Sequence, residues 1–336
     1  MIPKVHTYSD LDTAESFWRQ HWPRRCLFDL WPVRACFQQH YHHRPHFLVA
    51  SRGHQVCGLL ALSWIDDEHC FGHFPGEVWQ GKTWLEQNKI VAADAAAARA
   101  LLDQMPPGTR IRYLCPDHRL DKVHRATEDE TGYLFFPGQY QYAFQGYWGT
   151  FPGKSRKKLR SEINRLKNSH ITFRHNHPSD LEWMFRLNLE RYQGRSYFYD
   201  IRFLSAFESL AAWLQANDLL RVTTVLIGGR VAAVDMGAVW NGTYTVLAGG
   251  THADFPGVAK IINLHHLEWA CARRITVVDF LCGDFNWKRR FHLTPRPLYQ
   301  IKRPHVVETR HETRLLHQLG HQLGHQSEHP SAACAV

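Results

Sequence analysis

Residues 276–291 decide the fold and read Thr-Val-Val-Asp-Phe-Leu-Cys-Gly-Asp-Phe-Asn-Trp-Lys-Arg-Arg-Phe. Their apolar beginning predicts a buried strand over residues 275–281, and Gly283 then predicts a turn. Asp279 lies in this strand, and Asp284 directly follows the turn. Charge at the end of a buried strand costs free energy unless it is paired or faces a cleft. The pattern therefore indicates a site where a strand of a sheet ends.

The composition is that of a globular protein with about two domains. The chain has 336 residues, of which 44% are hydrophobic and 13% aromatic, and domains average about 150 residues. No run reaches the roughly 18 apolar residues of a membrane span, and the first residues lack the apolar centre of a signal peptide. The eight cysteines form no Cys-x-x-Cys pair, so reduced thiols and a cytoplasmic location are expected.

Basic residues give the chain a formal net charge of +9 and are concentrated in residues 154–167, where seven of fourteen are Lys or Arg. Leu159, Ile163 and Leu166 recur there at helical spacing. This predicted helix offers a surface for nucleic acid or charged lipid, and its alternative role is that of a solvated face.

The order hairpin, helix, strand occurs twice, at residues 47–114 and 222–281, which indicates an internal duplication. Residues 309–336 fall outside both copies and are expected to be disordered or marginally helical. The predicted helices begin near Leu11 and cover residues 92–102, 154–167, 181–192, 203–214 and 257–274; the predicted strands cover residues 47–50, 56–64, 110–114, 171–174, 222–226, 231–239, 243–248 and 275–281.

Five motifs of the second copy occur in the order of a known family. They are Lys154-Ser-Arg-Lys-Lys-Leu-Arg, Leu226-Ile-Gly-Gly-Arg-Val-Ala-Ala, Gly249-Gly-Thr with Phe255-Pro-Gly, Asp279-Phe-Leu-x-Gly-Asp, and Trp287-Lys-x-x-Phe. Over about residues 150–303 the chain resembles GNAT-superfamily acyltransferases of the FemAB/CelD-like branch. The resemblance implies two tandem GNAT-like α/β folds, each a mixed sheet flanked by helices. The expected domains are residues 1–148 and 149–308, followed by a His-rich tail at 309–336.

The resemblance also implies the activity. It predicts an acyltransferase that moves an acyl group, first of all from acyl-CoA, to an amine or hydroxyl group of a small-molecule or cell-envelope acceptor. The pyrophosphate loop is matched by Asp254-Phe-Pro-Gly257-Val-Ala259, where an aspartate replaces the usual Gln or Arg. The donor therefore stays open, with aminoacyl-tRNA as the alternative. A GNAT fold that only binds polyanions is the non-enzymatic alternative.

The expected catalytic residues follow from the same motif. Acyl transfer needs a base and a stabilised oxyanion, and Asp279 and Asp284 are the candidate bases, unless they cap the turn or pair with arginine. Lys288 is expected to bind a phosphate or carboxylate or to neutralise the oxyanion, unless it belongs to a solvated loop. Asp235, in the middle of a predicted strand, is expected to form a structural ion pair rather than to act in catalysis.

The expected binding residues surround this centre. The beginning of the helix at Gly257 offers free N–H groups to phosphate, unless it is an ordinary helix start. The expected cofactor-binding residues are Gly249, Gly257, Val258 and Ala259. The expected substrate-binding residues are Arg156, Arg195, Tyr199 and Trp287, of which Arg195 and Tyr199 line either the acceptor cleft or the core.

Two groups of histidines invite a metal-binding interpretation. Neither group has cysteine or carboxylate ligands at the spacing of a zinc site, so no metal is expected. The first group is expected in a loop and the second on one face of a helix; they are His40, His42, His43 and His46, and His317, His321 and His325.

Overall fold

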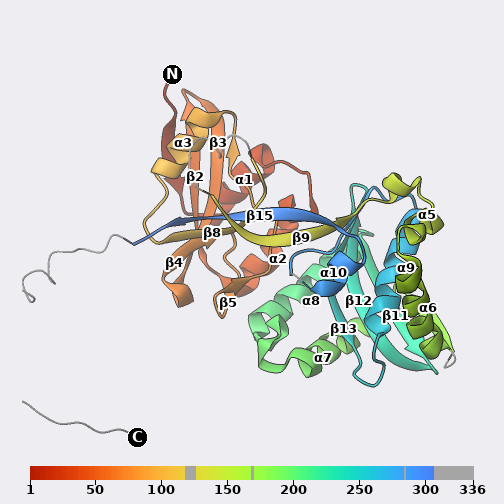
Figure 1. Ribbon diagram of the computed structural model, residues 1–336. Coiled ribbons are helices and arrows are strands. Elements are labelled where there is room, and N and C mark those ends of the chain that lie inside the picture. Colours follow the sequence, from red (N-terminus) through yellow and green to blue (C-terminus); the bar gives the residue numbers. More distant parts are fainter. Residues whose placement is uncertain (118–125, 168–169, 284, 306–336) are drawn as a thin grey trace, which may run out of the picture.

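The computed structural model describes residues 1–117, 126–167, 170–283 and 285–305, which form two α/β halves lying side by side (Figure 1). The first half begins with a strand, two helices and a long hairpin. Its elements are β1 (Lys4–Tyr8), α1 (Leu11–His21), α2 (Trp31–Tyr41), β2 (Arg44–Arg52), β3 (Gln55–Ile65), β4 (Cys70–His73), β5 (Val78–Trp79), β6 (Lys82–Thr83), β7 (Val91–Ala92), α3 (Ala95–Asp103), β8 (Thr109–Leu114) and β9 (Thr127–Phe135).

The second half repeats this order after two connecting helices. Its elements are α5 (Phe144–Gly149), α6 (Gly153–Lys167), β10 (Ile171–His175), α7 (Asp180–Tyr192), α8 (Ile201–Ala216), β11 (Leu220–Ile227), β12 (Arg230–Trp240), β13 (Thr243–Thr251), α9 (Val258–Ala272), β14 (Val277–Asp279), α10 (Asn286–Arg290) and β15 (Thr294–Arg303). None of the helices in the described ranges combines the length and apolarity that a membrane crossing requires.

Local sequence signals explain several element boundaries. The carboxylate of Asp10 accepts a hydrogen bond from the backbone N–H of Thr13 at 2.8 Å and caps α1, as expected of an aspartate at this position. Gly228 and Gly229 connect β11 to β12 with φ of 57° and 79°. A two-residue hairpin turn needs positive φ at both positions, which glycine adopts without strain.

The strands form one sheet of thirteen strands within the described residues, in the order β1-β2-β3-β4-β8-β15-β9-β14-β13-β12-β11-β10, with β7 beside β3. The two ends of this sheet mirror each other. In each half, four neighbouring antiparallel strands run from the edge of the sheet toward its middle. The fourth of them pairs in parallel with the next strand, β4 with β8 and β13 with β14. This arrangement confirms the predicted pair of tandem GNAT-like folds, each a mixed sheet flanked by helices.

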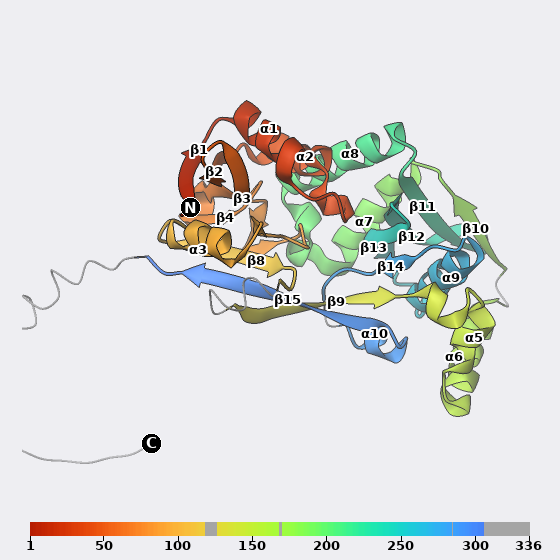
Figure 2. The ribbon, with the colours of Figure 1, turned by 90° about the horizontal axis from the view of Figure 1, so that it is seen from above.

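The two halves exchange their last strands. β15, from the end of the second half, pairs with β8 of the first, and Ile301 lies opposite Ile111. β9, from the end of the first half, pairs with β14 of the second, and Phe135 lies opposite Val278. β9 and β15 also pair with each other, and both cross between the halves (Figure 2). Neither half therefore has a complete sheet without the other.

A shared core also joins the halves. α2 packs on α8, and the rings of Phe37 and Phe207 lie 6.3 Å apart. Trp84 of the first half fills the same core, 4.8 Å from Phe207. Both phenylalanines are fully buried. Because buried aromatic side chains contribute strongly to stability, this core fixes how the halves meet.

Several details differ from the sequence prediction. β14 spans three residues rather than residues 275–281, because Ile275 donates its N–H to Ala270 O at the end of α9 and Leu281 has a φ of 55°. The histidines at 40–46 do not form a loop, since His40 lies in α2 and His46 in β2. The predicted tail and its three histidines lie outside the described residues. α2, β1, β9 and β15 were not predicted.

Candidate active site

The parallel strands β13 and β14 separate after three residue pairs, the last of which is Thr245 opposite Asp279. β13 continues along β12 as far as Thr251, whereas the chain after β14 turns away. A cavity of about 650 Å³ opens between residues 246–251 and residues 280–283. The predicted separation of these strands is thus confirmed, and we call this space the interface cavity because both halves line it.

Glu86 reaches the interface cavity from the first half. Its side chain is 4% exposed, and Oε1 accepts a hydrogen bond from the backbone N–H of Cys282 at 2.6 Å. Oε2 has no hydrogen-bond partner in the described structure, and the nearest cation, Arg296 Nη2, is 3.6 Å away. Burial, together with the charge of Asp279, raises the pKa of Glu86 to about 7. A carboxyl group with this pKa can accept or donate a proton near neutral pH.

The segment that carries Glu86 is held rigidly. Asn88 donates its backbone N–H to Tyr113 O at 2.9 Å, which ties the segment to the end of β8. The guanidinium of Arg34, which is 1% exposed, donates to Asn88 Oδ1 at 2.8 Å and to Phe74 O at 3.0 Å. Glu86 therefore lies on a fixed part of the first half, as preorganised catalysis requires.

Lys288 borders the interface cavity from α10 but is not free. Its Nζ donates to Phe280 O, Leu281 O and Cys282 O at 2.9, 2.9 and 2.8 Å. An ammonium group has three protons, and all three are used here. Burial lowers the pKa of Lys288 to about 8. Lys288 is 2% exposed, so the alternative of a solvated loop does not hold, and the lysine keeps the chain after β14 in its turned path.

Asp279 turns away from the interface cavity. Its carboxylate pairs with Arg296, with Nη1 2.7 Å from Oδ2, and accepts hydrogen bonds from Gln87 Nε2 at 3.0 Å and Leu281 N at 2.9 Å. These partners satisfy a carboxylate that is 2% exposed. This arrangement matches the arginine pair that the sequence left as the alternative role of Asp279. The other candidate, Asp284, lies outside the described residues.

Asp235 is one of three carboxylates that line the interface cavity in the described structure, with Glu86 and Glu130. Its Oδ2 lies 2.9 Å from Nε2 of His266, which is fully buried, and His266 Nδ1 lies 3.3 Å from the hydroxyl of Tyr244. Gly249 faces Asp235 across the β12–β13 pair, and a Cβ at Gly249 would lie 2.1 Å from Asp235 Oδ1. Gly249 therefore leaves room for this carboxylate.

The beginning of α9 borders the interface cavity through Ala259. Gly257 precedes the helix with a φ of 95°, a conformation that glycine adopts without strain. Val258 is 1% exposed and packs into the core, so only its backbone is available to a ligand. Asp254 is paired with Arg230, with Oδ2 2.8 Å from Nη2.

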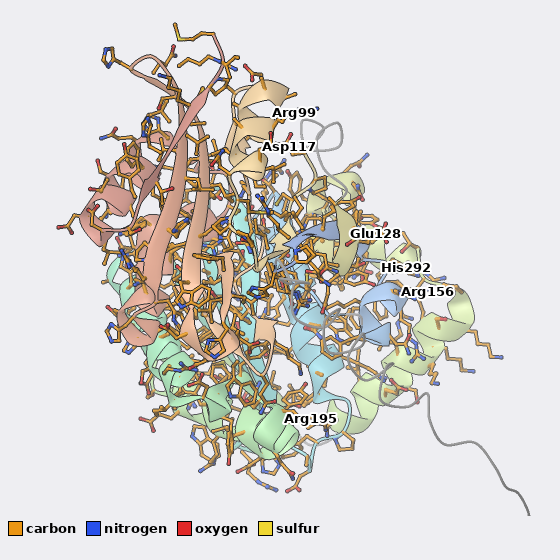
Figure 3. The ribbon with its side chains drawn as sticks, turned by 90° about the vertical axis from the view of Figure 1, so that its left-hand side faces the viewer. Arg99, Asp117, Glu128, Arg156, Arg195 and His292 are labelled. Carbon is orange, nitrogen blue, oxygen red and sulfur yellow. The ribbon has the colours of Figure 1, made fainter. Side chains whose placement is uncertain are left out.

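The predicted substrate-binding residues are only partly brought together. Trp287 lines the interface cavity. Arg156 and Arg195 lie well apart at the edge of the molecule and not at the cavity (Figure 3). Tyr199 is 67% exposed beside Trp79 and is also not part of the cavity wall. Arg195 and Tyr199 belong to two short 3-10 turns at residues 193–199, and Arg156 belongs to α6, so the fold does not bring these three residues to the cavity wall.

Residues that sequence reasoning missed complete the wall. Glu86 belongs to the first half, and Asn188 and Arg191 belong to the last turns of α7. Tyr197 donates its hydroxyl to Thr83 O at 3.1 Å and bridges the halves. No sequence motif marks these residues, since the packing of the halves alone brings them together. In the described ranges, no group of three His, Cys, Asp or Glu residues could hold a metal ion.

Comparisons with known proteins agree with this geometry. Residues 153–289 match the family model described as "Acetyltransferase (GNAT) domain". No curated protein sequence matches the chain. Among solved structures, FemX has a TM-score of 0.53 at 11% identity, covering 94% of this chain and 99% of its own.

Two further structures are similar over nearly their whole length. A conserved protein of unknown function from Bacteroides thetaiotaomicron has a TM-score of 0.52 at 15% identity, covering 88% of this chain and 99% of its own. L-PGS from Bacillus licheniformis has a TM-score of 0.50 at 11% identity, with 95% and 98% covered. Identities this low show the fold alone. With the matched domain, they confirm the resemblance to GNAT-superfamily proteins, and the domain supports a transferase.

Proposed function

We propose that this protein transfers an acyl group, carried by acyl-CoA, to an amine or hydroxyl acceptor bound in the interface cavity. The observation that carries the proposal is the position of Glu86. Its buried carboxylate leaves one oxygen without a hydrogen-bond partner in the described structure, beside the separated strands of the GNAT domain. A group of this kind in a cleft is a candidate for the catalytic base.

In this mechanism Glu86 Oε2 removes a proton from the acceptor N–H or O–H as the acceptor attacks the acyl carbonyl carbon. The carbon–sulfur bond of the tetrahedral intermediate then breaks, and the proton on Glu86 passes to the departing thiolate. We assign the oxyanion to backbone N–H groups of β13 beyond Thr245, where pairing with β14 ends. Lys288 is a positioning residue that keeps residues 280–282 in place.

The cavity wall provides an anion site for the donor. α9 begins beside the cavity, has fifteen residues and receives no side-chain cap at Gly257. Free N–H groups and the helix dipole at such a beginning favour phosphate. Arg230 neutralises the aspartate that replaces the usual polar residue of the pyrophosphate loop. These features favour acyl-CoA over a donor without a diphosphate.

Thermal unfolding in the presence of acetyl-CoA, longer acyl-CoAs and free CoA tests the donor. A ligand that binds only the folded state raises the unfolding temperature, so we expect a rise with one or more acyl-CoAs. Release of the CoA thiol, followed with a thiol-reactive dye and a panel of amines and alcohols, then tests the reaction. If no CoA compound shifts unfolding or releases thiol, the donor assignment fails and an aminoacyl-tRNA donor becomes the next to assay.

A matched pair of variants tests the base. Glu86→Gln is expected to reduce the rate of thiol release by about 100-fold or more. Acyl-CoA should still raise the unfolding temperature of this variant. Glu128→Gln changes an exposed carboxylate on β9 (Figure 3) and is expected to react as the unchanged protein does. If Glu86→Gln retains full activity, Glu86 is not the base. Binding of every polyanion alike, with no turnover, would instead support a non-enzymatic binding protein.

A further inference from the structure

A second hollow lies on the other side of α9. It has a volume of about 540 Å³ and lies among α5, α6, β10 and α9. One face of α9 lines the interface cavity and another face lines the second hollow, since residues three and four positions apart share a face of a helix. Ala259, Ile262 and Asn263 line the interface cavity, whereas Ile261, Leu264, His265 and Glu268 line the second hollow, which we call the outer groove.

Seven of the thirteen residues that line the outer groove are apolar, and its polar lining includes Gln145, Asn164 and His170. Phe144 and Trp148 of α5 form one side, Ile163 of α6 another, and Ile171 and Phe173 of β10 a third. Phe173 remains 36% exposed although its ring stacks on His265 at 4.0 Å. Aromatic and branched side chains left uncovered at a hollow mark a place for an apolar ligand.

Within the described residues, the ring of His265 stacks on the rings of Phe173 and His175, at 4.0 and 5.1 Å. Its Nε2 is buried and has no hydrogen-bond partner in the described structure. Burial, with the charges of His266 and His175, lowers the pKa of His265 to about 3, so its ring is neutral at physiological pH. A neutral ring suits a groove that holds an uncharged chain.

Positive charge lies on the wall of the outer groove and along the helix α6 that forms part of this wall. Arg160 of α6 lines the groove, with its guanidinium 5.9 Å from the ring of Trp148. Lys154, Lys157 and Lys158 are exposed on the same helix, and α6 extends away from the body of the molecule (Figure 2). Glu162 on this helix is bonded to Lys260 of α9, so it does not offset the exposed cations. The groove contains one carboxylate, that of Glu268.

We propose that the outer groove and the basic face of α6 dock the protein on an anionic membrane surface, with an acyl chain of a lipid entering the groove. The apolar walls take the chain, and the cations of α6 lie among the anionic headgroups. A nucleic acid would use the cations but would leave the apolar hollow empty, so the membrane explains more of the surface. This proposal does not rest on the proposed function.

Sedimentation with vesicles tests the docking. The full chain is mixed with vesicles of POPG and POPC in equal parts, or of POPC alone, at about 100 mM salt, where the Debye length is about 10 Å. We expect about tenfold stronger binding to the anionic vesicles, and a loss of most of this binding at several-fold higher salt. Equal binding to both vesicles, or to neither, would overturn the proposal.

Two charge reversals form a matched comparison. Arg156 lies on α6 and Arg99 on α3 of the other half, and both are labelled in Figure 3. Arg156→Glu is expected to weaken vesicle binding by about tenfold and Arg99→Glu by far less, because a charge acts only near the headgroups. If the two variants behave alike, the basic face of α6 is not the docking surface.

Two further measurements test the acyl chain. Phe173→Ser is expected to weaken binding by about fivefold because it removes apolar area from the rim, with the unfolding temperature as a check of folding. Lipids with brominated chains should quench tryptophan fluorescence, and Trp148→Phe should reduce that quenching. If Phe173→Ser binds normally and RNA displaces the vesicles, the surface is a nucleic-acid site and the proposal is wrong.

Discussion

The Oε1 atom of Glu86 accepts a hydrogen bond from the backbone N–H of Cys282 at 2.6 Å, although the two residues are 196 positions apart in the chain. Glu86 comes from the first half, and Cys282 lies three residues after the end of β14, where the chain of the second half turns away from β13. This bond joins the proposed base of one half to the proposed acyl site of the other. The first half therefore contributes a reacting group as well as support.

The rate of acyl transfer should depend on the ionisation of Glu86. Because burial raises its pKa to about 7, the active carboxylate form is scarce below that pH and predominates above it. We expect kcat/KM to rise about tenfold for each pH unit below 7 and to level off above it. Residual activity of Glu86→Gln should lack this rise. A pH profile of thiol release checks both expectations, and an unchanged profile in Glu86→Gln would contradict them.

Lys288→Ala should lower stability together with activity. The ammonium bonds three backbone carbonyls, and its loss leaves buried acceptors without partners, at a cost of about 3 kcal/mol or more. Denaturant unfolding measures this cost. Lys302→Ala removes an exposed lysine of β15 and should change the free energy of unfolding little. A Lys288→Ala protein of normal stability without activity would instead indicate direct contact with the substrate.

Gly249→Ala should displace the carboxylate of Asp235. The added Cβ would lie 2.1 Å from Oδ1, so either the strand or the Asp235–His266 contact must shift. We expect a stability loss of about 1–3 kcal/mol and a sharp loss of activity. Gly149→Ala is the matched control, because a Cβ there would contact nothing within 4 Å. Equal behaviour of both variants would show that Asp235 has room to move.

Asp254→Ala should strengthen CoA binding. The substitution removes a negative charge near the beginning of α9 and releases Arg230, which now pairs with that aspartate. A charge at the end of a helix is worth about 0.3–1 kcal/mol, so a two- to fivefold decrease in Kd is expected, roughly as that free energy implies. Calorimetric titration with CoA at low and high salt measures it. An increase in Kd would mean that phosphate binds elsewhere.

The sequence predicted most of the second half and the place of its cavity. Regular apolar spacing and glycine turns mark its helices and hairpin, and the motif at residues 276–291 marks the end of β14. α2 was missed because its inner face carries polar residues: Arg34 is 1% exposed and Gln38 8% exposed. Arg34 donates to the distant Phe74 O, a contact that a local pattern does not contain, and Gln38 donates to His43 O just beyond the helix.

The roles of individual site residues were harder to predict. The motif placed Asp279 in the strand, where it is the last residue of β14, and Lys288 after the turn, where it lies in α10, but their partners decide their roles. Arg296 forms an ion pair with Asp279, and Lys288 donates hydrogen bonds to three backbone carbonyls. Glu86 is one acidic residue among many in the sequence, and only the packing of the two halves places it at the cavity with a buried oxygen that has no hydrogen-bond partner in the described structure.

The exchange of β9 and β15 has a consequence for biosynthesis. A ribosome releases the chain from its N-terminus, and domains commonly fold as they emerge. Here β8 cannot pair with β15 until both halves have been translated, because Ile301, which lies opposite Ile111, is near the end of the second half. The nascent first half must therefore keep an unpaired strand edge for most of translation, which makes it the stage most exposed to aggregation and to chaperone capture.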